Sequence, residues 1–246
     1  MKKKAGILKK ISLYLLKLII GLFVFSILIV LLFKWVPVPI TPLMLIRLTE
    51  KTIQGKEVKF NKDWESIDEI SLHLPLAVVS SEDQRFLHHW GFDFESMEKA
   101  YESNKKGKKI RGASTISQQT AKNVFLWPGR NYLRKGLEVY FTGLIELLWS
   151  KERILEVYLN VIEMGDGIYG AQAASKIYFN KDAMAISAQQ AALIAAILPN
   201  PRKYSALRPT PYIQGRQNWI LRQMRNLEKI DFDAKEKPQK KKSKKK

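Results

Sequence analysis

A 23-residue apolar stretch near the N-terminus, from Ile11 to Phe33, constrains the fold more than any other feature of the chain. An α-helix needs about 20 apolar residues to cross the hydrocarbon core of a bilayer, and this stretch has that length. Lys17 is its only charged residue, and it lies close enough to the start for its ammonium group to reach the headgroups. The stretch therefore predicts one transmembrane helix.

The residues on either side of this stretch indicate how it lies in the membrane. Residues 1–10 carry five lysines and no acidic residue, and the positive-inside rule places such a flank in the cytoplasm. A cleaved signal peptide is the alternative, but its apolar region would be shorter and would end in small residues, whereas Lys34-Trp35-Val36-Pro37 follows here. We therefore expect a retained anchor over residues 11–33, with all that follows Trp35 on the outer side.

Charge indicates the class of partner. The formal net charge is +19, and the part of the chain between the lysine-rich ends is basic as well. Such a surface suits nucleic acid, anionic lipid or a phosphate-bearing substrate, and the predicted outer location excludes nucleic acid. The chain has no cysteine, so disulfides and thiolate metal sites are excluded.

The chain after the anchor divides into three parts. Residues 34–73 form a juxtamembrane linker with an expected short helix near Leu43–Leu48 and an expected extended piece near Glu57–Phe60. Residues 74–230 have the apolar spacing of helices and form the predicted helical domain. Residues 231–246 are lysine-rich and of low complexity, so we expect a disordered tail that contacts anionic lipid.

Local signals within residues 74–230 predict individual helices. Ser150 and Ser187 are expected N-caps, the latter in a capping box with Gln190. An amphipathic helix is predicted to begin near Tyr132. Its expected apolar stripe consists of Leu133, Leu137, Phe141, Leu144 and Leu148.

The stretch from Ser81 to Gly91 concentrates chemistry-bearing side chains. If Pro75 opens a helix, one face of that helix carries Val78, Val79, Glu82, Phe86 and His89. A carboxylate on an apolar stripe is poorly solvated, so the pKa of Glu82 should rise toward neutrality. A solvent-facing Glu-Asp pair at a helix rim is the alternative, and this stretch alone does not decide between them.

Two further segments suit an anionic ligand. The basic run 105–111 leads into Gly112-Ala113-Ser114-Thr115-Ile116-Ser117-Gln118-Gln119, a turn at a helix start, for which an ordinary N-cap is the alternative. Arg130, Arg134 and Lys135 crowd the next helix start, where positive charge is unfavourable unless an anion lies nearby. The apolar run 124–128 is a candidate for membrane contact, with core packing as its alternative.

Four motifs, taken in order, resemble the signature set of the peptidoglycan glycosyltransferases, the family 51 type, in its monofunctional membrane-anchored form. They are Glu82-Asp83-x-x-Phe86-x-x-His89-x-Gly91, Gly112-x-Ser114-Thr115-Ile116-x-Gln118-Gln119, Arg134-Lys135-x-x-Glu138 and Lys151-x-x-Ile154-Leu155-x-x-Tyr158-Leu159-Asn160. The resemblance covers residues 74–204. Ala113 and Ser117 depart from it, standing where glycine and threonine are common.

The resemblance implies a mainly α, lysozyme-like catalytic domain that polymerises lipid II into glycan strands in the plasma (inner) membrane of a bacterium. It implies that Glu82 is the catalytic base and Glu138 a second essential glutamate, and that the fourth motif is structural. Lys122 and Arg130 fall where the family contacts the donor's pyrophosphate. The other expected substrate-binding residues are Asp83, Phe86, His89, Ser114, Thr115, Gln118, Gln119, Arg134 and Lys135.

The expected chemistry is inverting transfer to the acceptor 4-hydroxyl, with release of undecaprenyl diphosphate. It requires a base and positive charge but no enzyme nucleophile. Arg134 and Lys135 should keep Glu138 ionised. No cofactor is expected, with a divalent cation such as Mg²⁺ at the diphosphate left open. The expected partners are lipid II, the glycan strand, the membrane and other cell-wall synthesis proteins.

Two other functions remain as alternatives to a glycosyltransferase. A membrane-tethered, lysozyme-like glycan hydrolase is the nearest rival, and a non-enzymatic membrane scaffold is a more distant one. Many family members also carry a penicillin-binding transpeptidase domain. The 42 residues after Tyr204 are too few for such a domain, so we expect no covalent binding of penicillin.

Overall fold

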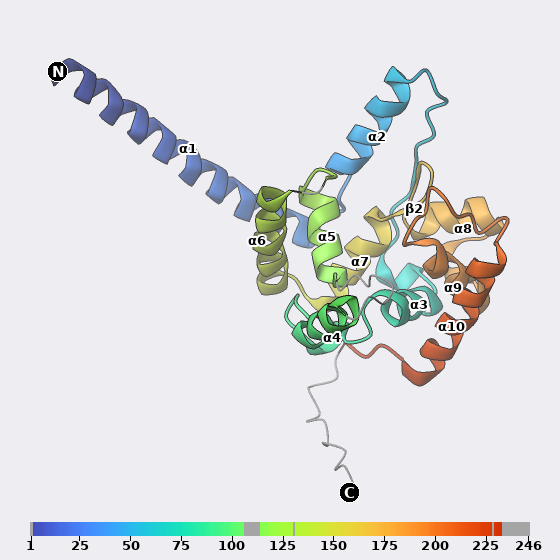
Figure 1. The fold of residues 1–246 in the computed structure, drawn as a ribbon. Coiled ribbons are helices and arrows are strands. Elements are labelled where there is room, and N and C mark those ends of the chain that lie inside the picture. Colours follow the sequence, from blue (N-terminus) through green and yellow to red (C-terminus); the bar gives the residue numbers. More distant parts are fainter. Residues whose placement is uncertain (1, 106–113, 130, 228, 233–246) are drawn as a thin grey trace, which may run out of the picture.

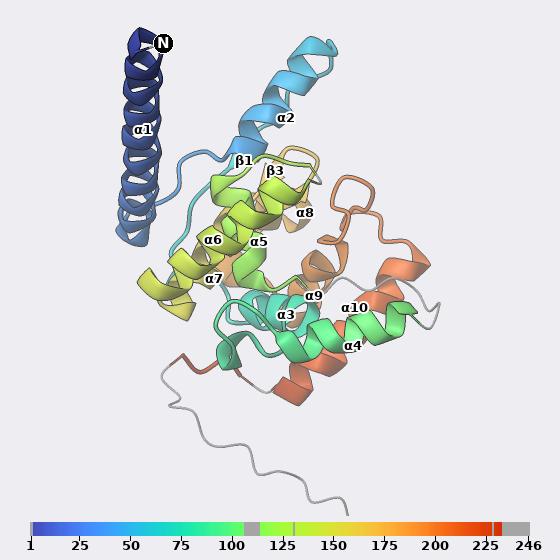
Figure 2. The same ribbon diagram turned by 60° about the vertical axis from the view of Figure 1, so that its left-hand side comes forward.

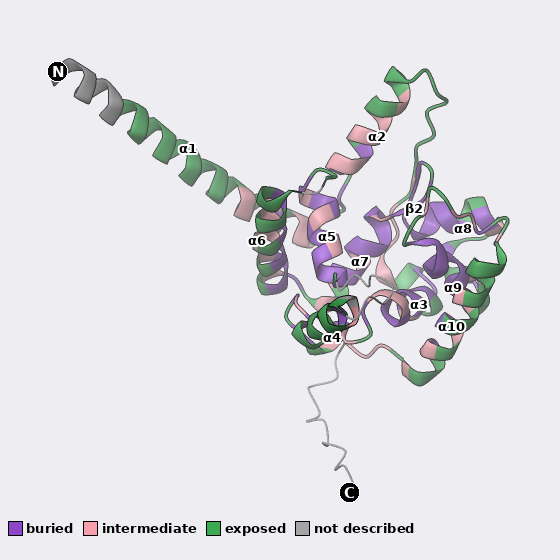
Figure 3. Ribbon diagram, in the orientation of Figure 1, coloured by how far each residue is buried: buried purple, intermediate pink, exposed green. Residues whose placement is uncertain are grey.

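The computed structural model describes residues 2–105, 114–129, 131–227 and 229–232, and within them the chain is mainly helical, as predicted. The longest helix, α1 (Lys2–Trp35), extends away from the body and is exposed along most of its length (Figures 1 and 3). Its segment Lys10–Trp35 is long and apolar enough to cross a membrane. The predicted anchor is therefore one continuous helix.

The end of α1 is fastened to the body. The indole of Trp149 donates a hydrogen bond of 2.8 Å to the carbonyl of Val30. The guanidinium of Arg153 donates to the carbonyls of Phe33 and Val36. The Arg153 bonds to Phe33 satisfy a carbonyl of the last turn, whose position four residues on is Pro37 and has no N–H group. They place the catalytic domain at a defined position next to the membrane anchor.

The juxtamembrane part contains a longer helix than predicted. Helix α2 (Pro42–Ile53) begins at the N-cap Thr41, with proline at its first position, and both α1 and α2 extend from the same side of the body (Figures 1 and 2). The extended piece lies at β1 (Asn61–Lys62) rather than at Glu57–Phe60. It pairs with β3 (Ile168–Tyr169), which pairs in turn with β2 (Glu163–Gly165).

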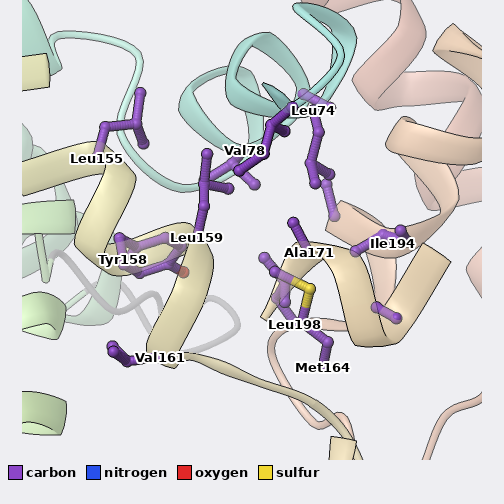
Figure 4. Close-up of a cluster of buried hydrophobic side chains, with 14 of the residues drawn as sticks. Leu74, Val78, Leu155, Tyr158, Leu159, Val161, Met164, Ala171, Ile194 and Leu198 are labelled. Atoms are coloured by element: carbon purple, nitrogen blue, oxygen red, sulfur yellow. The ribbon is translucent and has the colours of Figure 1, made fainter. Parts of the chain in front are cut away.

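Helix α3 (His73–Glu82) lies at the centre of the core. It packs against α9 (Ala188–Ile197) and α10 (Pro211–Leu227). Its buried side chains belong to one cluster with those of α7 (Lys151–Val161) and α9 (Figure 4). Alanines fill much of α9, so neighbouring backbones can approach closely. Ser187 and Gln190 form the predicted capping box, and Ser150 caps α7 as predicted.

The remaining elements surround this centre. They are α4 (Phe94–Lys105), α5 (Ile116–Phe125), α6 (Tyr132–Leu148), α8 (Ala171–Phe179) and the 3-10 turns η1 (Ile67–Glu69), η2 (Phe86–His88) and η3 (Ala183–Ala185). Helix α6 begins where predicted, but its predicted stripe is not its most buried side. Leu133 is exposed, whereas Arg134, Glu138 and Thr142 are buried. The sequence pattern missed this because the buried side of α6 faces a polar pocket.

The apolar run 124–128 contributes to the core. Val124 and Leu126 are buried, and the Phe125 ring stacks on Phe141 with 4.6 Å between ring centroids. Trp127 is partly exposed, at 38%. The core-packing alternative is therefore correct for the first three residues of this run.

Candidate active site

Glu82 is the last residue of α3, and the chain leaves the helix at Asp83. The prediction that Glu82, Phe86 and His89 share one helical face is therefore wrong. Phe86 lies in η2, and His89 lies in extended backbone beyond it. The physical reason is a competing set of bonds: the Asp83 carboxylate accepts from the backbone N–H of Ile116 at 3.0 Å and contacts His89 Nε2 at 2.9 Å.

Polar groups surround the Glu82 carboxylate. Ser81 Oγ donates to Oε1 at 3.0 Å, and Gln119 Nε2 donates to Oε2 at 3.1 Å. Arg216 of α10 lies 3.8 Å from Oε1. The side chain is 15% exposed, so the solvent-facing alternative is wrong. The buried Val78 and Val79 lie one turn before Glu82 in α3, as predicted, but polar groups contact the carboxylate itself. These donors favour a carboxylate that accepts hydrogen bonds.

Several predicted substrate-binding residues fix the conformation of the backbone around Glu82. Thr115 and Gln118 form a capping box at the start of α5, so the N-cap alternative is correct for this pair. The Thr115 hydroxyl also donates to the carbonyl of Gly91 at 2.6 Å. Lys151 donates to the carbonyl of His89 and lies over the buried Phe86 ring. These contacts fasten the loop after Glu82 to α5 and α7.

Two pockets meet at Ser114. The first, of about 410 Å³, contains Glu82. Its other lining residues are Ser81, Asp83, Gln84, Arg85, Asp93, Ser96, Lys99, Ala100, Ser114 and Thr115. The second, of about 470 Å³, lies between α2, α5 and α6 and contains Lys122, Arg134, Lys135 and Glu138. Both predicted glutamates therefore line pockets, and these pockets are neighbours.

Glu138 is the paired carboxylate of the second pocket. Arg134 donates to its Oε2 at 2.7 Å and Lys135 to its Oε1 at 2.5 Å. Burial acts to raise the pKa of Glu138, but the hydrogen bonds and charges of Lys135 and Arg134 outweigh it, so the pKa is lowered. The expectation that these two residues keep Glu138 ionised is confirmed.

Lys122 brings further positive charge into the same pocket. Burial lowers the pKa of its ammonium group, which the charges of Arg134 and Lys135 lower further against the opposing effect of Glu138. Among the described residues, neither Lys122 Nζ nor the buried Nε of Arg134 has a hydrogen-bond partner. Unpartnered, desolvated donors favour an anionic ligand. Arg130, also predicted here, lies outside the described residues.

Sequence reasoning missed three residues that contact the site or line a pocket. Arg216 approaches Glu82 from α10, Tyr158 reaches Gln119 from α7, and Arg47 of α2 lines the second pocket. No spacing pattern connects Arg216 or Arg47 to the glutamates, because they come from opposite ends of the chain. Tyr158 stood in a motif that was interpreted as structural.

The donor set of the second pocket does not fit a metal held by the protein alone. Among the described residues, no group of three His, Cys, Asp or Glu side chains is arranged to hold an ion. Both oxygens of Glu138 accept from cationic side chains. The described cationic residues that line this pocket are Arg47, Lys122, Arg134 and Lys135.

Comparison with known proteins identifies the family. The transglycosylase family model matches residues 49–225. The biosynthetic peptidoglycan transglycosylase of Pseudomonas syringae pv. syringae (strain B728a) is 54% identical over 202 residues, which cover 82% of this chain and 86% of the relative. The protein of that name from Bacteroides thetaiotaomicron is 54% identical over 223 residues, covering 91% and 90%. The chain therefore belongs to the transglycosylase family and is a peptidoglycan glycosyltransferase.

Proposed function

We propose that the enzyme polymerises lipid II into glycan strands, with Glu82 as the general base and the cationic pocket as the site of the donor's diphosphate. The observation that carries this proposal is the pair of pockets meeting at Ser114. One contains the hydrogen-bonded carboxylate of Glu82, and the other contains Lys122, Arg134 and Lys135. Inverting glycosyl transfer needs a base and a cationic leaving-group site, adjacent to each other.

The two pockets have separate parts in the proposed reaction. The acceptor sugar enters the first pocket, and its 4-hydroxyl gives its proton to the Glu82 carboxylate. The hydroxyl oxygen bonds to C1 of the donor as the bond between C1 and the diphosphate oxygen breaks. Lys122, Arg134 and Lys135 stabilise the negative charge of the departing undecaprenyl diphosphate. Glu138 orients Arg134 and Lys135 toward it.

Helix α6 connects the second pocket to the predicted anchor. The Tyr140 hydroxyl lies 2.7 Å from Ser26 Oγ, and Trp149 bonds to Val30, so α1 and α6 run in the same direction. Helix α6, which lines the second pocket with Arg134, therefore packs beside α1. We infer an N-terminus in the cytoplasm and a catalytic domain on the outer side of the plasma membrane, where a lipid-linked substrate meets the pocket.

The proposed reaction has no step that depends on a divalent cation. Three cationic side chains already face the diphosphate site, and Glu138 is engaged by two of them. A Mg²⁺ ion would have to be held mainly by the substrate's own phosphates, as is common for this ion. We propose that the cationic side chains supply the charge stabilisation that the reaction requires.

The decisive experiment uses purified protein and lipid II, with the products separated on a gel. The parental enzyme should form long strands, whereas a glycan hydrolase would shorten strands that are added to it. Glu82→Gln should lose about 10²–10⁴-fold in rate while it still binds lipid II, because a general base typically contributes that factor. Glu98→Gln, at an exposed carboxylate on α4, is the matched control. Polymerisation by Glu82→Gln at the parental rate would refute the mechanism.

A further inference from the structure

A buried tyrosine is connected to Glu82 through a single amide. Tyr158 of α7 lies in the hydrophobic core (Figure 4), and its side chain is fully buried. Its hydroxyl donates to Gln119 Oε1 at 3.2 Å, and Gln119 Nε2 donates to Glu82 Oε2 at 3.1 Å. We propose that Tyr158 is a positioning residue, which fixes the Gln119 amide so that its N–H group holds Glu82 ready to accept a proton. The proposal rests on the assignment of Glu82 as the base.

The two ends of the Gln119 amide are not equivalent in this arrangement. With Oε1 accepting from Tyr158, the amide must present Nε2 to Glu82. A flipped amide would place its carbonyl oxygen against the carboxylate, and the two acceptors would repel each other. The orientation of Gln119 therefore gives Oε2 of Glu82 an N–H donor.

The Tyr158 hydroxyl is a dependable donor. Burial raises the pKa of Tyr158 well above its ordinary value, and the charges of Glu82 and Asp83 raise it further. The hydroxyl therefore stays protonated over the whole range in which enzymes work. Gln119 Oε1 is its hydrogen-bond acceptor among the described residues.

The chain of hydrogen bonds from Tyr158 through Gln119 to Glu82, here called the relay, also sets the rotation of the carboxylate. Oε2 is held by Gln119, while Oε1 accepts from Ser81 and faces Arg216 at 3.8 Å. The other charged groups that act on this region are Asp83, next in the chain, and Lys122 on α5. Because Gln119 is anchored at its far end by a core residue, Oε2 cannot turn away when substrate enters. A motif residue deep in the core thus acts on the reaction without touching substrate.

The test compares two tyrosine variants. Tyr158→Phe removes only the hydroxyl, and it should lower kcat for lipid II polymerisation by about 3- to 10-fold at unchanged KM, the range expected for one hydrogen bond. Tyr178→Phe is the control, because Tyr178 is also buried and its hydroxyl donates to the carbonyl of Met164 at 2.9 Å. Tyr178→Phe should lose similar thermal stability yet keep the parental kcat. Equal kcat values for the two variants would overturn the proposal.

A double-mutant cycle separates positioning from general loosening of the core. Gln119→Met removes both hydrogen bonds of the relay at similar volume, so adding Tyr158→Phe to it should change kcat by less than about twofold. If the two losses multiply, Tyr158 does not act through Gln119 and the proposal is wrong. This outcome is distinct from failure of the proposed mechanism, which shows as activity of Glu82→Gln whatever the cycle gives.

Discussion

Arg216 Nη2 lies 3.8 Å from Oε1 of Glu82, although one residue is on the last helix of the domain and the other ends α3. The same guanidinium contacts Ser81 Oγ at 3.4 Å. The C-terminal helix therefore places a positive charge beside the proposed base. A positive charge at this distance attracts the carboxylate and, with Ser81, limits its rotation.

We predict that Arg216→Gln lowers kcat/KM for lipid II by about tenfold, since a neutral amide no longer stabilises the carboxylate electrostatically. Arg216→Lys should be more active than Arg216→Gln, because lysine keeps the positive charge. It should be less active than the parent, because lysine lacks the planar, several-donor guanidinium group. Arg222→Gln changes an exposed arginine on the same helix and should leave the rate unchanged. Thermal unfolding of all three variants reports whether the helix still packs. Loss of activity only together with loss of folding would contradict the prediction.

A second prediction concerns the loop after Glu82. Gly91 has φ +75°, and a Cβ atom there would lie 2.7 Å from Cγ2 of Thr142. Gly91→Ala should therefore lower the unfolding free energy by more than the ~1–3 kcal/mol of backbone strain alone. Gly55→Ala is the control, because Gly55 also has positive φ (+61°) but no atom within 4 Å. Denaturant unfolding in detergent should show the larger loss at Gly91, and equal losses would mean that the loop moves to accommodate the methyl group.

These residues show where sequence reasoning succeeds. The anchor helix, the mainly helical domain and the caps at Ser150 and Ser187 were predicted because each depends on neighbours within a few positions. The lowered pKa of Glu138 was predictable for the same reason, since Arg134 and Lys135 lie within one turn of it.

Sequence reasoning fails where distant segments meet. The end of α3 at Asp83 depends on the backbone of Ile116, so the helical face expected through Phe86 and His89 could not be excluded from spacing. The polar surroundings of Glu82 come from Gln119 and Arg216, which no periodicity connects to it. On α6 the apolar stripe was predicted to be the buried side, but a pocket of charged residues takes that place.

The lowered pKa of Glu138 predicts a pH-dependent contribution to stability. Its folded-state pKa lies below the ordinary value of 4.5, so the ionised group stabilises the fold above that value, and the contribution disappears as pH falls through the folded-state pKa. Glu138→Gln should therefore be less stable than the parent at pH 7, where it leaves the buried Arg134 without an anionic partner. The difference in thermal midpoint should shrink below pH 4.5. A pH-independent difference would show that the ion pair does not stabilise the fold.

Removal of metal ions tests the source of charge at the diphosphate. Because Lys122, Arg134 and Lys135 face this pocket, we predict that glycan polymerisation continues after treatment with excess EDTA. The rate with lipid II should be measured before chelation, after it and after Mg²⁺ is restored. Complete loss that Mg²⁺ reverses would show that a divalent cation is required and that the side chains do not suffice.

Lys122 allows function to be separated from folding. Its ammonium group is desolvated and lies near two other cations, so its pKa is lowered and the charged form costs stability in the absence of an anion. Lys122→Met should therefore leave the thermal midpoint unchanged or raise it, while KM for lipid II rises because the diphosphate loses a charged donor. Lys181→Met, at an exposed lysine outside both pockets, is the control and should change neither quantity.

A diphosphate-bearing ligand should stabilise the parent against heat more than it stabilises Lys122→Met. The reason is that the bound anion relieves the repulsion among Lys122, Arg134 and Lys135 only when all three are present. Equal stabilisation of both proteins would mean that the anion binds elsewhere.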